Sequence, residues 1–357
     1  MQRLVLCCLE SRACIAKTVV MHHLIPLESP GEWRDALNGI KHAFAHTWEN
    51  CYAMYLSTGY TTYLYRYEAD SVRVVCPLAE REFAGHLDIV TPYGFSGFVG
   101  SRNCSQFPSH WREFANSRGY VCGYIALNPL FENQSFSEPE DVHATNSLYF
   151  LDLMLSHDEL LARLDRNRRR QLRAWDNSSG SVIFDRAILS EFFVSHFYNM
   201  LQRVGASLAT YLSRPALEFL CSLDSTFLAG VKIDNRVESA TMFTITPFSA
   251  DALFHVALPE GRRHAVPLLW SAATYLKALN VPVLNLGGGI RDNDSLAQFK
   301  QRFGARRASF RSLKQVYRPD LYAALCREVN ADSQNMLRYF PAYRDPACRP
   351  LNSLTTC

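Results

Sequence analysis

The order of predicted secondary-structure elements repeats within this 357-residue chain. A β-hairpin pattern at 60–79, with Glu68-Ala69-Asp70 at its turn, is followed by a short strand, a helix and a further strand. The same order begins again with a hairpin that turns at Asp234-Asn235. Each hairpin has β-branched and aromatic residues on both sides of its turn. Strands that alternate with helices predict a mixed sheet, and a repeated order predicts two related domains. We therefore expect an α/β (α+β) fold, with a mixed twisted sheet flanked by helices in each half.

Domain boundaries follow from breaks in this pattern. The sequence DNSSGS at 176–181 is the clearest break in the second half of the chain. A length of 357 residues and a hydrophobic content of 48% are sufficient for about two domains, each with its own core. We expect an N-terminal tail over 1–18, a first domain over 19–175, a second domain over 182–330 and a C-terminal tail over 331–357.

Two helix starts are evident in the first half. Ser29 before Pro30 is typical of a helix N-terminus, because serine suits the N-cap and proline the first helical position. A further helix is predicted to open at Ser156 and to run to about Trp175.

Composition excludes several classes of protein. No run of about 18 apolar residues occurs, so no transmembrane segment is expected. The short apolar stretch at the N-terminus meets Glu10 and Arg12 without a small-residue cleavage site, so a signal peptide is not predicted. The 11 cysteines are an odd number without a CxxC pair. They disfavour a zinc ribbon or a disulfide framework and indicate a reducing, cytoplasmic location.

Three consecutive glycines, Gly287, Gly288 and Gly289, follow the strand-like sequence LNL. Glycine loses the most backbone freedom on folding, so three in succession indicate a sharp turn or a close approach of the backbone to another group. Lys300 on the next predicted helix would direct its charge into the same space; the alternative is a tight turn with a solvated lysine. The P-loop and Rossmann signatures are absent, because neither GK[ST] nor GxGxxG is present.

Positive charge is concentrated in two segments. Residues 163–173 hold six arginines against one acid, and residues 299–314 hold six cations and no acid. Arginine binds phosphate through its planar fork. Nucleic acid, a nucleotide pyrophosphate and a lipid diphosphate would all be attracted, so the charge alone does not select a partner. The alternative is a solvated helix face.

Two further features have competing interpretations. In the sequence PYGFSG, Tyr93 lies between Pro92 and Gly94 and would form a pocket wall that donates a hydrogen bond, or else a turn with a core aromatic. His255 lies in the apolar strand LFHVAL and is interpreted as a satisfied core residue. No HExxH or GxSxG sequence occurs, so zinc-protease and serine-hydrolase chemistry are not predicted.

These motifs resemble those of a known family when they are taken in order. PYGFSG at 92–97, LDRNRRRQLR at 164–173, RVGAS at 203–207 and LNLGGG-x6-LAQFKQRFG at 284–304 occur in the order found in the FemABX-like acyltransferases. The resemblance covers roughly residues 19–325 and implies two tandem GNAT-type domains, in agreement with the repeated order of elements.

The resemblance also implies functional residues. Lys300, between Phe299 and Phe303, matches a lysine beside the channel for the acyl donor and the acceptor, and Tyr93 matches a tyrosine near the acceptor site. These two are the predicted catalytic residues. The predicted substrate-binding residues are Arg168, Arg169, Arg170, Tyr211, Gly287, Gly288, Gly289, Phe299, Arg302 and Phe303.

The activity that the resemblance implies is transfer of an aminoacyl group to an amine acceptor, which forms an amide. The acceptor would be a peptidoglycan precursor, including a lipid-linked one at the membrane surface, or a small peptide or natural product. CoA-dependent GNAT enzymes hold the donor pyrophosphate on a glycine loop before a helix. Here GRRHAVPLLW places Gly261 too early and Pro267 inside that segment. This departure favours aminoacyl-tRNA over acyl-CoA as donor.

Other predictions complete this interpretation. No tightly bound cofactor and no metal are expected, and the sequence indicates no Glu or His base. Two alternatives remain open. One is an acyl-CoA-dependent GNAT N-acyltransferase; the other is a non-catalytic module that binds RNA or an anionic glycolipid.

Overall fold

A computed structural model describes residues 20–205, 211–289 and 294–348. The strands are β1 (Met21–Pro26), β2 (Thr62–Ala69), β3 (Val72–Phe83), β4 (His86–Val90), β5 (Val99–Gly100), β6 (Cys122–Ala126), β7 (Val142–Asp152), β8 (Ser181–Ile183), β9 (Thr226–Ile233), β10 (Arg236–Ile245), β11 (Ala250–Ala257), β12 (Val283–Gly288) and β13 (Arg306–Val316). Within the described residues these thirteen strands form one sheet in the order β1-β2-β3-β4-β6-β13-β7-β12-β11-β10-β9-β8, with β5 paired to β3. The predicted tail over 1–18 lies outside the described residues.

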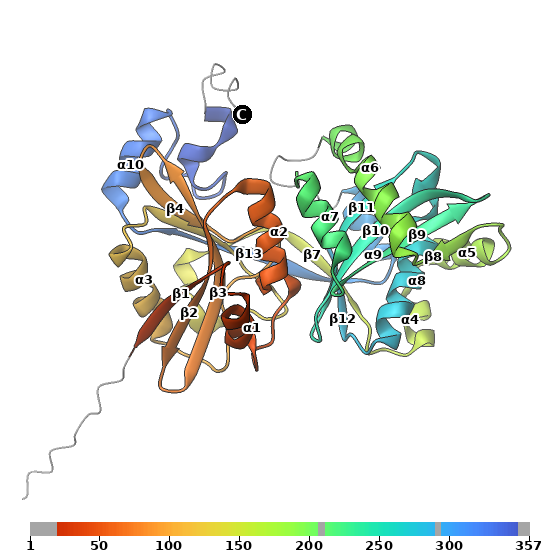
Figure 1. Cartoon of the computed structure of the whole chain (residues 1–357), viewed down its shortest axis with the longest axis horizontal. Coiled ribbons are helices and arrows are strands. Elements are labelled where there is room, and N and C mark those ends of the chain that lie inside the picture. The colour runs from red at the N-terminus through yellow and green to blue at the C-terminus, as the bar shows by residue number, and fades with distance from the viewer. Residues whose placement is uncertain (1–19, 206–210, 290–293, 349–357) are drawn as a thin grey trace, which may run out of the picture.

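Helices cover both faces of this sheet. They are α1 (Pro30–Leu37), α2 (Trp48–Thr58), α3 (Phe107–Ser117), α4 (His157–Arg163), α5 (Arg166–Asp176), α6 (Arg186–Val204), α7 (Arg214–Ser222), α8 (Ala265–Ala278), α9 (Ser295–Arg302) and α10 (Pro319–Glu328). Figure 1 shows two halves side by side, with β1–β4 in the left half, β8–β12 in the right half, and β7 and β13 between them. The predicted α/β class is confirmed. In the described part of the chain, no helix is long and apolar enough to cross a membrane.

Both predicted hairpins are present. The β9–β10 hairpin turns at Asp234 and Asn235, which have φ values of 45° and 66°. Asn and Asp tolerate this left-handed region because their short side chains can bond to the local backbone. The β2–β3 hairpin turns at Asp70 and Ser71, one residue later than the Glu68-Ala69-Asp70 turn that the sequence predicts.

The single helix predicted from Ser156 to about Trp175 is wrong, because the chain breaks between α4 and α5. Asp165 caps α5 by accepting a hydrogen bond from the Arg168 backbone N–H at 2.7 Å. Its own N–H donates to the Arg302 carbonyl at 2.9 Å. These bonds fix the start of α5 directly against the end of α9.

The halves exchange their last strands. β7, at the end of the first half of the chain, pairs with β12 of the second half. β13, at the end of the second half, pairs with β6 of the first half, and β7 and β13 pair with each other. Residues beyond β13 follow it into the first half, where Tyr343 is 1% exposed and Arg344 bonds Asp88. The structure therefore differs from the expected boundaries: 306–330 pack with the first half, and 331–348, expected as part of a tail, pack there too.

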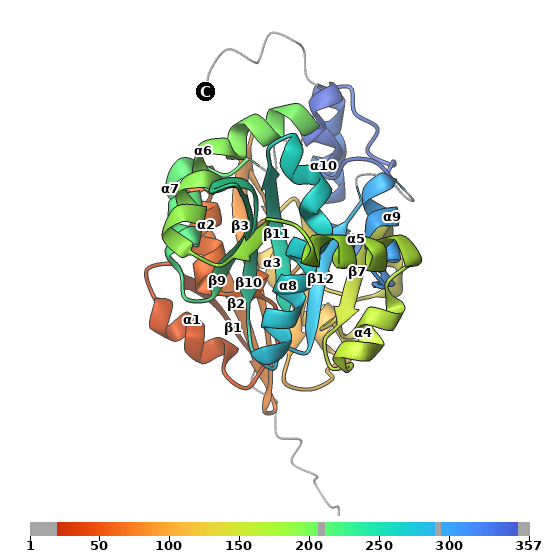
Figure 2. The same cartoon turned by 90° about the vertical axis from the view of Figure 1, so that its right-hand side faces the viewer.

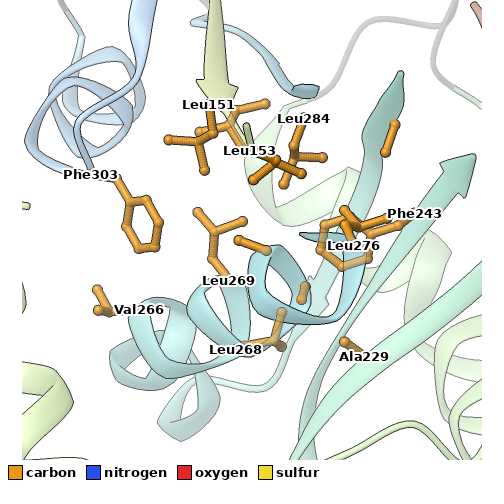
Figure 3. Packing of buried hydrophobic residues seen from close by; sticks show 14 of the residues in the cluster. Leu151, Leu153, Ala229, Phe243, Val266, Leu268, Leu269, Leu276, Leu284 and Phe303 are labelled. Atoms are coloured by element: carbon orange, nitrogen blue, oxygen red, sulfur yellow. The ribbon is translucent and has the colours of Figure 1, made fainter. Parts of the chain in front are cut away.

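Each half is stabilised by apolar cores of its own, and a further apolar cluster joins residues of both halves. In the second half, α8 packs on the sheet through Leu268, Leu269 and Leu276, against residues of β7 and β12 (Figure 3). Figure 2 shows α8 in front of this sheet, with α5 crossing near α9. A second contact joins the halves, because α7 packs on α2 and the backbone N–H of Ser213 donates to Ser57 Oγ at 3.0 Å. The space between the halves is thus bounded on one side by the central strands and on another by the α2–α7 contact.

Candidate active site

A cavity of about 1730 Å³ lies between the two halves. Its lining comes from α2, β2, β3, β4 and β6 of the first half, from the central strands β7 and β13, and from α6, β10, β11, α8, β12 and α9 of the second half. Ligand pockets for drug-sized molecules typically measure about 300–1,000 Å³. This cavity therefore has room for parts of two substrates at once.

The floor of the cavity is formed where two parallel strands separate. β11 and β12 share only two residue pairs, Ala250 with Leu284 and Asp251 with Asn285. Asn285 Nδ2 donates to Asp251 Oδ1 at 2.8 Å, which joins the strands at their last common level. Beyond this point β12 enters the glycine run, and the backbone N–H of Gly287 donates to Asn285 Oδ1 at 2.9 Å.

The glycine run allows both a turn of the chain and a close approach of its backbone to β7. Gly287 has a φ of +71°, which favours glycine. A Cβ on Gly288 would lie 2.9 Å from the Ser147 carbonyl oxygen of β7, so a side chain does not fit there. Asn146 Nδ2 donates to the Gly289 carbonyl at 2.7 Å. Gly287, Gly288 and Gly289 all line the cavity. The following loop, 290–293, lies outside the described residues.

Lys300 points into this turn from α9. Its side chain is 6% exposed, and Nζ donates to the Gly288 carbonyl at 2.6 Å. The alternative of a solvated lysine is therefore wrong. Burial lowers the pKa of Lys300 to about 8, and the Asp294 charge opposes that shift. The ammonium is still the main form at pH 7, so the cavity holds a poorly solvated cation beside its floor.

Both tyrosines that the sequence predicts for the site, Tyr93 and Tyr211, line the cavity. The Tyr93 ring stacks on Phe254 of β11 with centroids 5.7 Å apart, and Asn50 Nδ2 donates to the Tyr93 carbonyl at 3.1 Å. The adjacent Gly94 has a φ of +123°, and a Cβ there would lie 2.8 Å from Ala45 Cβ. Tyr211 lines the cavity near α6, just after the gap at 206–210 in the described residues, which contains part of the RVGAS sequence.

The predicted arginines lie outside the cavity. Arg168 places its guanidinium 4.6 Å from the centre of the Phe299 ring, and the Phe299 side chain lines the cavity. Arg169 is half-buried and Arg170 is exposed on the same helix, away from the cavity lining. Arg302 is exposed and lies 3.9 Å from the Asp165 carboxylate. These arginines form a basic rim behind the α9 wall.

Phe303 has a different place from the one predicted. Its ring is 2% exposed and belongs to the core around α8, where Figure 3 shows it beside Val266 and Leu269. The cavity lining does not include it. Phe303 therefore anchors α9, while Phe299 and Lys300 on the same helix reach the cavity.

Sequence reasoning missed polar residues on β11. Asp251 lines the cavity, and burial raises the pKa of its carboxyl to about 6, while the hydrogen bond from Asn285 opposes that shift. The interpretation of His255 as a core residue is wrong, because its side chain is exposed to the cavity. An isolated histidine in an apolar strand carries no signal that the strand borders a cavity. The cavity also receives three arginines, and the complete charged lining is Arg81, Arg203, Arg262, Lys300 and Asp251.

Neither a family model nor a curated protein matches the chain. Several solved structures, however, superpose on it. FemX superposes with a TM-score of 0.64 at 12% identity, covering 85% of this chain and 99% of FemX. The chain has the FemX fold. The C-terminal domain of a candidate lysylphosphatidylglycerol synthetase from Agrobacterium fabrum gives a TM-score of 0.54 at 12% identity, covering 84% of this chain and 96% of that one. L-PGS from Bacillus licheniformis gives a TM-score of 0.52 at 9% identity, covering 81% of this chain and 92% of L-PGS.

Each half of the chain forms a unit with the order that the sequence predicts, a hairpin followed by a strand, a helix and a strand. In each unit the parallel pair lies between an outer antiparallel sheet and the central strands: β4 with β6 in the first, β11 with β12 in the second. The cavity borders both pairs, since Val90, Tyr124 and Asn285 all line it.

The segment that leads into α8 determines whether the start of this helix is able to bind a phosphate group. Gly261 is buried against β10, where a Cβ would lie 2.1 Å from the Glu238 carbonyl oxygen. The backbone N–H of Ala265, the first residue of α8, bonds the Arg262 carbonyl, and Pro267 has no N–H. A helix start binds phosphate through several free N–H groups. The first turn of α8 is poorly suited to that role.

Proposed function

We propose that this protein transfers an aminoacyl group from aminoacyl-tRNA to an amine acceptor. The observation that carries the proposal is the buried ammonium of Lys300 at the glycine turn that floors the cavity. A cation of this kind stabilises the oxyanion that develops when an amine attacks an ester carbonyl. The products are an amide and the free hydroxyl of the tRNA ribose.

The mainly positive charge of the cavity lining supports a substrate that carries negative charge. Among the lining residues of the described chain, Arg81, Arg203, Arg262 and Lys300 are cationic and Asp251 is the one carboxylate. The basic rim on α5 adds positive field beside the α9 wall. In this proposal Arg168, Arg169 and Arg170 hold donor phosphates outside the cavity. Tyr93, in the cavity, orients the acceptor amine.

The choice of donor rests on α8. Its first turn has fewer free N–H groups than an ordinary helix start, because the Ala265 N–H bonds the Arg262 carbonyl and Pro267 has no N–H. A CoA pyrophosphate would be bound by such groups, so their loss supports a tRNA donor. The similarity to a candidate lysylphosphatidylglycerol synthetase supports an aminoacyl group as the group transferred, since the name of that protein specifies a lysyl group. A peptidoglycan precursor, free or lipid-linked, and a small peptide or natural product remain the proposed acceptors.

Mass spectrometry of mixed reactions tests this function. The purified protein is incubated with total aminoacyl-tRNA and, as acceptor probes, a nucleotide-linked peptidoglycan precursor and a lysine-containing peptide. The expected product is an acceptor heavier by one aminoacyl residue, and ribonuclease treatment of the donor abolishes it. A product formed only from acyl-CoA would establish the CoA-dependent alternative. Salt-sensitive RNA binding with no product from either donor would establish a binding module.

A further inference from the structure

His255 lies opposite Thr241 in the β10–β11 register. Its Nδ1 and Thr241 Oγ1 are 2.7 Å apart, so this hydrogen bond fixes the plane of the imidazole. The side chain is nevertheless exposed, and the space that it reaches is the cavity. With Nδ1 engaged, Nε2 is the ring nitrogen left for a substrate.

The separation of β11 and β12 places His255 across from Lys300. Asp251 and Asn285 form the apex, where the two strands last pair. His255 lies four residues beyond the apex on β11, and Gly288 lies three residues beyond it on β12. Parallel strands rise roughly 3.3 Å per residue, so the two positions stand at similar heights on opposite sides of the opening. Lys300 Nζ is bonded to the carbonyl of Gly288. A carbonyl group held between the strands would therefore have a cation on one side and an imidazole on the other.

The protonation states of the cavity side chains indicate which of them is able to accept a proton. Solvent reaches the His255 side chain only through the cavity, and desolvation by the surrounding protein lowers the pKa of His255 to about 4. The imidazole is therefore neutral at pH 7, and the proton that it accepts is readily passed on. Tyr93, also at the cavity, has its pKa raised by burial and stays protonated. Asp251 is the other candidate base, but one carboxylate oxygen is engaged by Asn285 at the apex, below the level of Gly288.

We propose that His255 is the catalytic residue that accepts the proton from the attacking amine, with Thr241 as its positioning residue. This inference rests on the proposed acyl transfer. The amine nitrogen forms a bond to the ester carbonyl carbon, and the carbonyl electrons move to the oxygen beside Lys300. His255 Nε2 takes one proton from that nitrogen, while Nδ1–H donates to Thr241 Oγ1. The tetrahedral intermediate then collapses, the bond to the ribose oxygen breaks, and the imidazolium returns the proton to that oxygen.

The test measures single-turnover transfer by wild-type protein, His255→Ala, His255→Gln and the control His23→Ala. His23 is exposed on β1, pairs with Glu32 and does not line the cavity. A positioned general base contributes about 10²–10⁴-fold, so His255→Ala is expected to lose transfer by that factor. Imidazole added to the solution should enter the vacated space and restore transfer at least tenfold. In His255→Gln the glutamine side chain occupies that space, so no rescue is expected.

The outcomes of this test distinguish failure of His255 as the base from failure of the proposed acyl transfer. Wild-type protein that forms product while His255→Ala matches its rate would overturn the base role and leave acyl transfer intact. Loss of transfer in folded His255→Ala without rescue by imidazole would also contradict it, since a structural role predicts that result. If wild-type protein forms no product with any donor, acyl transfer itself fails and the base role fails with it.

Discussion

In the described residues, each half of the molecule has one pair of parallel strands that share two residue pairs, β4 with β6 and β11 with β12. In the first half the gap beyond the pair is filled by the backbone. The Ala126 N–H donates to Thr91 Oγ1 at 3.0 Å, and Ser96 forms a parallel bridge with Leu127. In the second half the gap stays open, and His255, Asp251 and the glycine turn line it. The comparison indicates that the first pair supports the fold and the second is available for chemistry.

Buried charges differ between the halves in the same way. In the first half, the Asp88 carboxylate is fully buried and bonds Arg81 and Arg344, each at 2.6 Å, and accepts a hydrogen bond from Tyr343 at 2.8 Å. In the second half, Lys300 bonds a backbone carbonyl, and the Asp251 carboxyl bonds a neutral amide. A buried ion pair is costly to break, whereas groups with shifted pKa values cluster at functional sites.

The largest stability effect is expected at Asp88. Asp88→Ala leaves Arg81 and Arg344 nearly buried without their carboxylate, and breaking such a pair typically costs about 3–5 kcal/mol. Urea unfolding should show this loss. The matched control is Arg214→Ala, which removes an exposed ion pair with Glu218 and should change the free energy of unfolding by less than about 1 kcal/mol. Equal effects of the two substitutions would contradict the claim that the buried charges of the first half support the fold.

A smaller effect of opposite sign is expected at Asp251. The folded protein raises the pKa of this carboxyl to about 6 from an ordinary 3.8, so the charged form is disfavoured in the native state. Wild-type protein therefore loses stability from this group as the pH rises from about 4 to 6. Asp251→Asn keeps the bond to Asn285 without the charge. It should raise the free energy of unfolding at pH 7.5 by on the order of 2 kcal/mol and have little effect at pH 4.

Unfolding of both proteins at these two pH values checks that sign. Other titrating groups are common to the two proteins and cancel in the difference. A variant less stable than wild type at pH 7.5 would show that the charge of Asp251 supports the fold, which would break the comparison with Asp88.

Local sequence was sufficient for part of this account. The β9–β10 turn is encoded by Asp234 and Asn235, and the glycine run indicated a close backbone approach that the structure contains at Gly288. The exchange of β7 and β13 depends on pairing between distant segments, which local patterns do not report. His255 was misassigned for a related reason. An apolar strand beside a core and one beside a cavity have the same alternation, and only the separation of β11 from β12 distinguishes them.

Two buried lysines allow the most direct test. Lys300 bonds the Gly288 carbonyl at the cavity. Lys314, 4% exposed on β13, bonds the carbonyls of Met336 and Arg338 and does not line the cavity. Both lysines have pKa values lowered by burial. They therefore resemble each other in chemistry and differ in their position relative to the cavity.

The decisive measurement compares single-turnover aminoacyl transfer and urea unfolding of Lys300→Met and Lys314→Met. Lys300→Met should lose transfer by at least about 10²-fold, since one donor to an oxyanion contributes about 10²–10³-fold. Its free energy of unfolding should be unchanged or higher, because removal of a desolvated charge offsets the lost hydrogen bond. Lys314→Met should transfer within a few-fold of wild type and be less stable, because it leaves two carbonyls, those of Met336 and Arg338, without their donor. Wild-type transfer by folded Lys300→Met would contradict the claim that the second strand pair carries the chemistry.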